Sequence, residues 1–345
     1  MSLLGALWTI VTPGYPRILI LEYGIDHIWE MDVQIDIVEP DIALFTTLSP
    51  SHIAGFGTVE AYYAEKHKLL RRKYKDTYAI GNADDRNQSG FDCQSHYTTT
   101  MRSPSDVSVE NCVEYVDRSE CEIVLGTHRY HIVTPIIGDY LMGSLAGAFL
   151  VAQRVGASED EIIHSFATIS LPDGRGNTLA WLYDSLIIDG TYNGGFDPII
   201  AGVQSLVCRA SLEGRKTIAL IGDMRELGVL EDARHRELWA KLEQFPVDQY
   251  VFVGAVCDRI IRPLVGADWQ DRVFFTLDSR IAWERIRTLL SGDSQKYLIF
   301  AKGSQNTIYL EESLKAFVQP EEYGALVRQS DFYRKKKQVF FETLH

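Results

Sequence analysis

The chain has 345 residues, of which 46% are hydrophobic and 23% are charged, and its formal net charge is −13. At roughly 150 residues per domain, this length predicts about two domains, and the hydrophobic content excludes a disordered chain. The negative charge argues against a general nucleic-acid binder. The five scattered cysteines include no CxxC pair, so neither a disulfide framework nor a structural zinc site is expected. The apolar stretch 3–11 is too short to span a membrane and lacks signal-peptide features, so we expect a cytoplasmic chain without membrane insertion.

The first half of the chain predicts strands followed by helices. Two apolar runs, 17–22 and 41–46, each end in polar residues and are typical of buried parallel strands. A helical pattern covers 58–75. The Ser- and Thr-rich stretch 86–135 predicts a small β insertion with strands at 108–116, 121–125 and 128–133. Helices are expected over 140–155 and 158–166.

The second half alternates regularly between strand and helix patterns, which predicts a doubly wound parallel sheet. We expect strands at 186–188, 217–221, 249–253 and 297–300, and helices at 198–210, 233–242, 280–290 and 310–317. The basic run 334–337 is interpreted as a solvated tail, with a partner-binding role as the alternative.

Two strand ends carry candidate ligands. Glu22 ends the first predicted strand, at the edge where doubly wound sheets bind ligands, although such a carboxylate can also cap a neighbouring helix. His52 follows the second strand and is either a loop histidine or a ligand. Together they could hold Mg²⁺, for which histidine is an unusual ligand.

Several ordered segments resemble the Mur ligases, which are ATP-dependent amide-bond ligases of peptidoglycan synthesis. EYGIDHIWEMD at 22–32, the stretch 40–70 and NADD at 82–85 resemble the central domain of that family. IIDGTYNGGFDP at 187–198, IALIGDMRELG at 218–228 and AKGSQNTIYLEE at 301–312 resemble its C-terminal domain. The GDMRELG block is similar to the member that adds D-alanyl-D-alanine.

The resemblance implies an α/β fold in two domains. Residues 1–171 would form an incomplete, N-terminally truncated central parallel-sheet domain of the Mur-ligase type, with the small β insertion at about 86–135. Residues 172–345 would form the doubly wound α/β C-terminal domain.

The resemblance also assigns roles to individual residues. The metal-binding and catalytic residues would be Glu22, His52 and Lys66. Lys66 falls on the family's carbamylated lysine, and a carbamate would offer two hard oxygens to Mg²⁺, whereas an ordinary helix lysine would face solvent. The nucleotide side would include Tyr140, Ser144, Arg175, Asp189, Tyr192 and Asn193, with Tyr140 and Ser144 standing where the family usually has His and Asn. The side that receives the dipeptide would include Asp223, Glu226, Lys302, Gly303 and Ser304. Gly222 and Gly303 are equally explained by the conformational freedom that glycine gives a turn.

One family feature is missing from these 345 residues. ATP binding in the family uses a glycine-rich loop that ends in Gly-Lys-Thr, yet the sequence contains no Gly-Lys dipeptide. We therefore expect the phosphate loop and the N-terminal UDP-binding domain to be absent, which argues against ATP binding by this chain alone.

The implied reaction is the addition of D-alanyl-D-alanine to a UDP-MurNAc-tripeptide through an acyl phosphate, with ATP and Mg²⁺. The chain alone is expected to be inactive, and a missing N-terminal segment or a partner chain would supply the phosphate loop. A non-catalytic binding or scaffold relative, and a sister ligase of the folylpolyglutamate synthase type, are the alternatives.

Overall fold

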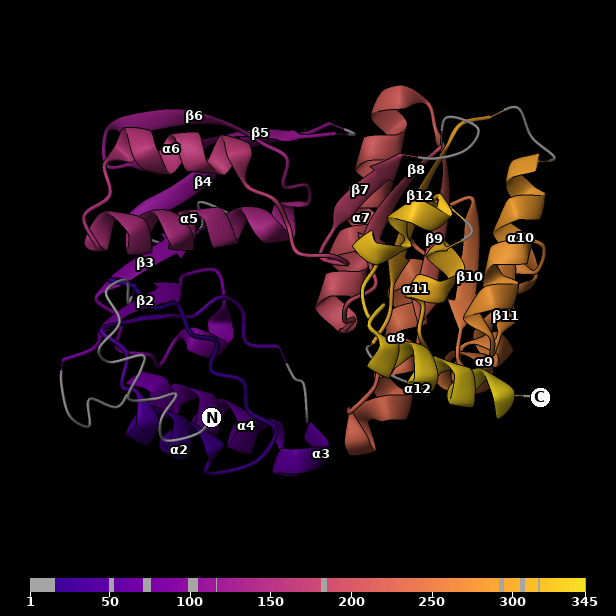
Figure 1. The fold of residues 1–345 in the computed structure, drawn as a ribbon, viewed down its shortest axis with the longest axis horizontal. Helices are drawn as coiled ribbons and strands as arrows, with labels where there is room; N and C mark the ends of the chain where they lie inside the picture. The colour runs from indigo at the N-terminus through magenta and orange to yellow at the C-terminus, as the bar shows by residue number, and fades with distance from the viewer. Residues whose placement is uncertain are drawn as a thin grey trace.

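The structure is a computed structural model, and it describes residues 16–49, 53–70, 76–98, 105–115, 117–180, 185–291, 295–304, 308–315 and 317–344. These residues form two sheets of six strands each, with helices packed against both (Figure 1). No helix in these ranges is long and apolar enough to cross a membrane.

The first sheet has the strand order β1-β2-β3-β4-β5-β6. The first four strands pair in parallel, and β4, β5 and β6 form an antiparallel meander. The strands are β1 (Ile42–Leu44), β2 (Tyr78–Asn82), β3 (Ser95–Thr98), β4 (Val107–Glu114), β5 (Ser119–Leu125) and β6 (His128–Thr134). The region 86–135 is β-rich, and its strands β3 to β6 continue the sheet that begins with β1 and β2.

Two sets of helices accompany this sheet. Helices α5 (Asp139–Arg154) and α6 (Glu159–Thr168) pack on the strands through one apolar cluster that includes Phe149 and Ile162. A capping box in which Ser158 and Glu161 bond reciprocally begins α6, as the acidic start of the predicted helix indicated. A second cluster, centred on Met31 and Tyr62, joins α2 (Glu30–Ile37), α3 (Ile53–Phe56) and α4 (Val59–His67), and the 3-10 turn η1 (Lys68–Leu70) follows α4.

The predicted strand at 17–22 is wrong. Residues 16–25 have no regular secondary structure, and the side chains of Ile18, Leu19, Ile20 and Leu21 are 44–88% exposed. An apolar run becomes a strand only when a neighbouring strand satisfies its backbone groups. Within the described residues, β1 pairs with β2 alone, and the segment 16–25 does not pair with the other edge of β1.

The second sheet has the order β11-β10-β9-β12-β8-β7, and every pair is parallel except β7 with β8. Its strands are β7 (Asn177–Ala180), β8 (Leu186–Gly190), β9 (Lys216–Gly222), β10 (Gln249–Val253), β11 (Val273–Thr276) and β12 (Tyr297–Lys302). The central strands are apolar through their middle because both faces are covered, which confirms the doubly wound arrangement.

Helices cover the two faces of this sheet separately. One core contains α7 (Phe196–Glu213), α8 (Glu231–Leu242) and α9 (Ala255–Ile260), with Trp239 fully buried at its centre. The other contains α10 (Ser279–Ser291) and α11 (Glu311–Leu314). Short 3-10 turns complete the chain: η2 (Arg86–Gln88), η4 (Gly228–Leu230), η5 (Arg262–Leu264), η6 (Ala267–Trp269) and η7 (Pro320–Ala325).

The C-terminal helix α12 (Asp331–Glu342) corrects the interpretation of the basic run as a solvated tail. Lys337 is buried and its Nζ lies 2.8 Å from Glu311 and 2.6 Å from Glu312, both on α11. The basic run is therefore part of a helix that this lysine fastens to the second sheet's domain.

Helix α7 lies between the two sheets (Figure 1). Arg209 donates from Nε to the carbonyl oxygen of Tyr115 at 3.1 Å, and Ser205 donates to Glu114. A third contact joins Ser49 Oγ to the Asp197 carboxylate at 2.7 Å. The two halves of the chain are thus connected by polar contacts at both ends of α7.

Candidate functional site at the carboxyl edge of the second sheet

Three loops meet at the carboxyl edge of the second sheet because glycines let their backbones touch. A Cβ added at Gly194, after β8, would lie 2.7 Å from the carbonyl carbon of Gly303, which follows β12. A Cβ added at Gly303 would lie 2.8 Å from the Cα of Gly222, at the end of β9. Neither Gly222 nor Gly303 has a positive φ, so close backbone approach, rather than conformational freedom, explains these two glycines.

Ser304 fastens the same three loops with hydrogen bonds. Its hydroxyl donates to the carbonyl of Gly194 at 2.8 Å and accepts from the amide of Arg225 at 2.9 Å. Its own amide donates to the carbonyl of Asp223 at 3.1 Å. The sequence blocks 187–198, 218–228 and 301–312 therefore converge on one side chain.

Asp189 and Lys302 lie near the ends of neighbouring strands, β8 and β12, beside this junction. Asp189 is buried and accepts two hydrogen bonds from Thr191, at 2.9 Å from the amide and 2.6 Å from the hydroxyl. Burial nevertheless raises the pKa of the Asp189 carboxyl. Lys302 Nζ lies 3.5 Å from the carbonyl oxygen of Gly190, and burial together with nearby Arg175 lowers its pKa to about 8, against the attraction of Asp189.

Arg175 and Tyr192 lie at the surface of the same edge. The guanidinium carbon of Arg175 stands 4.0 Å from the centre of the Tyr192 ring, in cation–π contact. The amide of Tyr192 donates to the carbonyl of Gly174 at 3.2 Å, which links the two loops, and the side-chain oxygen Oδ1 of Asn193 accepts from the amide of Gly194 at 2.8 Å. All three predicted residues of the nucleotide side in this half thus lie near Asp189.

Asp223 and Glu226 differ in their surroundings. The carboxylate of Asp223 is buried and accepts from the amides of Val256 and Cys257, at 3.1 and 2.7 Å, at the start of α9. Glu226 is exposed and has a left-handed backbone with φ 63°. Of the two, only Glu226 is presented to solvent.

Asp223, His235 and Cys257 are the one group within the described ranges whose His, Cys, Asp or Glu ligand atoms lie close enough together for a metal, all within 4.8 Å. His235 Nε2 accepts from the amide of Met224 at 3.1 Å, and Nδ1 contacts the carbonyl oxygen of Glu231 at 2.8 Å. That carbonyl requires a donor, so the neutral tautomer has its hydrogen on Nδ1. Because both ring nitrogens and both Asp223 oxygens are engaged, this group holds the loop in place and does not fit a metal.

The second group of predicted residues lies near α4, in the first half. Lys66 Nζ donates to the carbonyl oxygen of Tyr23 at 3.1 Å. Burial lowers the pKa of Lys66, while the nearby carboxylates of Glu22 and Asp26 raise it. Glu22 itself is exposed and lies in the irregular segment 16–25, not at a strand end. His52 lies outside the described residues.

The predicted adenine contacts are on α5. Ser144 is exposed on this helix, and the side chain of Tyr140 is outside the part of the structure that is described. Neither position is tested further by the geometry.

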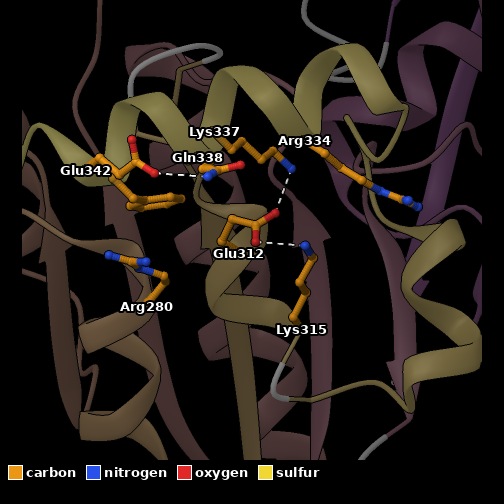
Figure 2. Close-up of a pocket in the computed structure, with 8 residues that line it drawn as sticks. Arg280, Glu312, Lys315, Arg334, Lys337, Gln338 and Glu342 are labelled. Atoms are coloured by element: carbon orange, nitrogen blue, oxygen red, sulfur yellow. Dashed lines mark hydrogen bonds and ion pairs between the residues drawn. The ribbon is translucent and has the colours of Figure 1, made fainter.

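A separate cavity of about 500 Å³ lies between α12 and the helices α10 and α11 (Figure 2). Glu312 stands at its centre between Lys315 and Lys337, with Nζ–carboxylate distances of 2.8 and 2.6 Å. Arg280 is paired with Asp278 at 2.6 Å. These cations already have carboxylate partners, and none of the predicted site residues lines this cavity.

Two residues that support the site were not predicted. Thr191 holds Asp189, and the position of its hydroxyl two residues after a strand-end carboxylate was a usable signal. Arg328 contacts the carbonyl oxygens of Thr191 and Tyr192 from more than 130 residues away, and no local sequence pattern indicates it.

Comparison with known proteins finds similarity to the Mur ligases. Residues 11–152 match the family model described as "Mur ligase middle domain". The UDP-N-acetylmuramoyl-tripeptide--D-alanyl-D-alanine ligase of Escherichia coli is 25% identical over 312 residues, which are 89% of this chain and 66% of that protein. The Haemophilus influenzae protein of the same name is 25% identical over 257 residues, 74% of this chain and 55% of its own. The chain thus spans between about half and two thirds of these relatives.

The fold agrees with this match. The crystal structure of the MurF ligase from Thermotoga maritima in complex with ADP superposes with a TM-score of 0.72 at 20% identity, covering 88% of this chain and 67% of that one. At that identity the likeness concerns the fold alone. Residues 11–152 are thus similar to a Mur ligase middle domain, and the chain shares the fold of a Mur ligase.

Proposed function

We propose that this chain forms the metal-binding part and the C-terminal domain of a Mur ligase that adds D-alanyl-D-alanine to a UDP-linked muramoyl tripeptide. The observation that carries the proposal is the convergence of three motif blocks on Ser304, which builds one site from residues 187–198, 218–228 and 301–312. The names of the relatives at 25% identity support the choice of D-alanyl-D-alanine. The proposal includes a domain boundary near residue 171, so that each of the two sheets belongs to a different domain.

The nucleotide is assigned to the edge formed by β8 and its loop. Arg175 and Tyr192 offer a cation and an aromatic face at the surface, and Asp189 and Asn193 lie beside them. An ADP-bound structural neighbour supports a nucleotide in this fold. Ser144 and Tyr140 on α5 are assigned to the adenine.

The metal is assigned to Glu22, His52 and Lys66. The surroundings of Lys66 fit this role, because burial lowers its pKa and so favours the neutral amine, the form that reacts with CO₂. A carbamate on Lys66 and the carboxylate of Glu22 would provide hard oxygen ligands. A divalent cation bound there would neutralise negative charge on a transferred phosphate.

The dipeptide is assigned to the loops around Ser304, with Asp223, Glu226, Lys302 and Gly303. The tripeptide carboxylate is activated as an acyl phosphate, the dipeptide amine attacks its carbonyl carbon, and collapse of the tetrahedral intermediate expels phosphate. With a pKa of about 8, Lys302 is an ammonium at neutral pH and pairs with the dipeptide carboxylate. Since these 345 residues contain no Gly-Lys dipeptide, we expect ligation only when other polypeptide supplies the phosphate loop.

Calorimetry with the purified chain tests the assignment. We expect D-alanyl-D-alanine to bind in preference to L-alanyl-L-alanine, L-lysine and L-glutamate, and Lys302→Met to weaken that binding. Lys296→Met, immediately before the start of the same strand, is the control. Preference for L-glutamate would favour a ligase of the folylpolyglutamate synthase type, and binding of none of them would refute the proposal.

A ligation assay tests the requirement for the phosphate loop. We expect no product from the chain with ATP, Mg²⁺, bicarbonate and both substrates, and product when a polypeptide with a Gly-Lys-Thr loop and a UDP-binding domain is added. Product from the chain alone would overturn the requirement. Binding without ligation in either mixture would indicate a non-catalytic binding protein.

A further inference from the structure

Arg328 connects the C-terminal segment to the loop after β8. Its Nη1 donates to the carbonyl of Tyr192 at 2.9 Å, and its Nη2 donates to the carbonyl of Thr191 at 2.7 Å. The same guanidinium holds Glu311 through both carboxylate oxygens, at 2.9 and 2.6 Å. One side chain therefore links α11 to the loop that carries the proposed nucleotide contacts.

The Arg328–Glu311 pair is buried and its geometry is specific. The side chains are 6% and 0% exposed, and the planar guanidinium matches the carboxylate in a two-bond arrangement. Arg328 also has a left-handed backbone with φ 56°, a conformation that an arginine adopts only where its surroundings compensate for the cost. The strained backbone of Arg328 therefore positions its guanidinium next to the turn at Thr191 and Tyr192.

Val327 makes a second contact with the same region. Gly174 has a φ of +70°, and a Cβ added there would lie 2.7 Å from Val327 and 2.8 Å from the amide nitrogen of Tyr192. The segment 327–328 therefore contacts both loops that the Arg175–Tyr192 pair joins.

We propose that Arg328 is a positioning residue that orders the Thr191–Tyr192 turn and so holds the Arg175–Tyr192 pair ready for nucleotide. The role for nucleotide rests on the proposed function, whereas the ordering of the turn does not. Arg328 acts through carbonyl oxygens of the loop, so its removal affects loop order and nucleotide affinity together.

Lys337 provides a matched control. It contacts the same Glu311, at 2.8 Å, and it is also buried, but its other partner is Glu312 on α11. Lys337→Met therefore removes a buried cation from Glu311 without removing a hydrogen bond to the loop. A difference between Arg328→Met and Lys337→Met separates positioning of the loop from general loss of stability.

Amide hydrogen exchange tests the ordering directly. In Arg328→Met we expect exchange at the Tyr192 amide, which is bonded to Gly174, to become faster by about tenfold, and we expect no change there in Lys337→Met. Should Arg328→Met fail to fold because Glu311 keeps a buried charge, the double variant Arg328→Met/Glu311→Gln removes both charges and leaves Lys337 paired with Glu312. Unchanged exchange in the folded variant would overturn the proposal.

ADP binding by the same variants tests the consequence for nucleotide. We expect a dissociation constant about tenfold higher in Arg328→Met, a similar increase in Arg328→Lys, which keeps the charge but not the planar donors, and no change in Lys337→Met. Faster exchange without weaker ADP binding would refute the positioning role. If the unmodified chain binds no ADP, the nucleotide assignment fails, while the exchange experiment still decides whether Arg328 orders the turn.

Discussion

Gly194 and Gly195 are adjacent in the sequence but differ in the space around them, which makes them a sharp test of the glycine junction. In Gly194→Ala the new Cβ would lie 2.7, 2.8 and 3.0 Å from three backbone atoms of Gly303. Ordinary van der Waals contact begins at 3.4 Å, so the loop or the end of β12 must move by at least 0.7 Å. All three close atoms belong to the backbone of Gly303, which cannot move aside as easily as the end of a flexible side chain.

The expected cost follows from two terms. Overpacking a rigid site costs about 1–3 kcal/mol, and displacement of the loop weakens the 2.8 Å hydrogen bond from Ser304 to Gly194, worth about 1 kcal/mol. Adding a Cβ also reduces the conformational freedom of the unfolded chain, which stabilises the folded state by about 0.4–1 kcal/mol. We therefore expect Gly194→Ala to lower the free energy of unfolding by about 1–3 kcal/mol.

Gly195→Ala is the control. Its Cβ would meet only Pro198 Cδ, at 4.0 Å, and its φ of −135° and ψ of 176° suit alanine. Alanine is a poorer N-cap than glycine for α7, which lowers stability by a few tenths to about 1 kcal/mol. Restricting the unfolded chain raises stability by about the same amount, so the free energy of unfolding should hardly change. Urea unfolding followed by tryptophan fluorescence measures the free energy of unfolding of both variants, since Trp239 lies in the core packed against this sheet. Equal stability of the two variants would refute the reasoning.

Three further predictions concern other parts of the molecule. Lys66 should give a carbamate carbon resonance with ¹³C-bicarbonate that is absent in Lys66→Arg, because its lowered pKa favours the neutral amine; identical spectra would contradict this. Lys302 has a pKa of about 8 in the folded chain and an ordinary value of 10.5. Between pH 8 and pH 10.5, therefore, the Lys302 amine is mostly protonated in the unfolded chain and mostly neutral in the folded chain. Stability relative to Lys302→Met should therefore rise from pH 8 to pH 10.5, and a flat difference in urea midpoints would refute the shift. His235→Ala leaves the buried amide of Met224 without its acceptor and should cost about 1–3 kcal/mol in urea unfolding, whereas added Zn²⁺ should not raise the melting temperature of the unmodified chain.

The second sheet could be predicted largely from the sequence because its strands are continuous apolar runs separated by helical patterns. β8, β9, β10 and β12 lie where expected. The strands β7 and β11 and the helices α9 and α12 were missed, because β7, β11 and α9 are short and α12 is mostly polar. Their formation depends on neighbours: β11 pairs with β10, and α12 is held by Lys337.

The error at residues 17–22 has a different cause. Hydrophobicity shows which segments of a sequence are favourable to bury, but a strand also needs a neighbouring strand to hydrogen-bond with. Periodicity along one segment carries no information about whether that neighbour exists. The same limit applies to Arg328, whose partners Thr191 and Tyr192 are brought to it only by the folded arrangement of β8 and α11.

The GDMRELG block shows how one motif combines anchoring and presentation. Asp223 caps the start of α9 with its carboxylate, and His235 holds the amide of Met224, so the inner part of the loop is fixed at both ends. Arg225 and Glu226 then lie exposed at the edge, and Glu226 adopts a left-handed conformation that costs about 1–2 kcal/mol for a residue with a Cβ. Such strain persists only where the flanking anchors determine the path of the chain. It follows that Asp223 anchors this loop from within, while Arg225 and Glu226 are exposed to solvent beside the proposed dipeptide site.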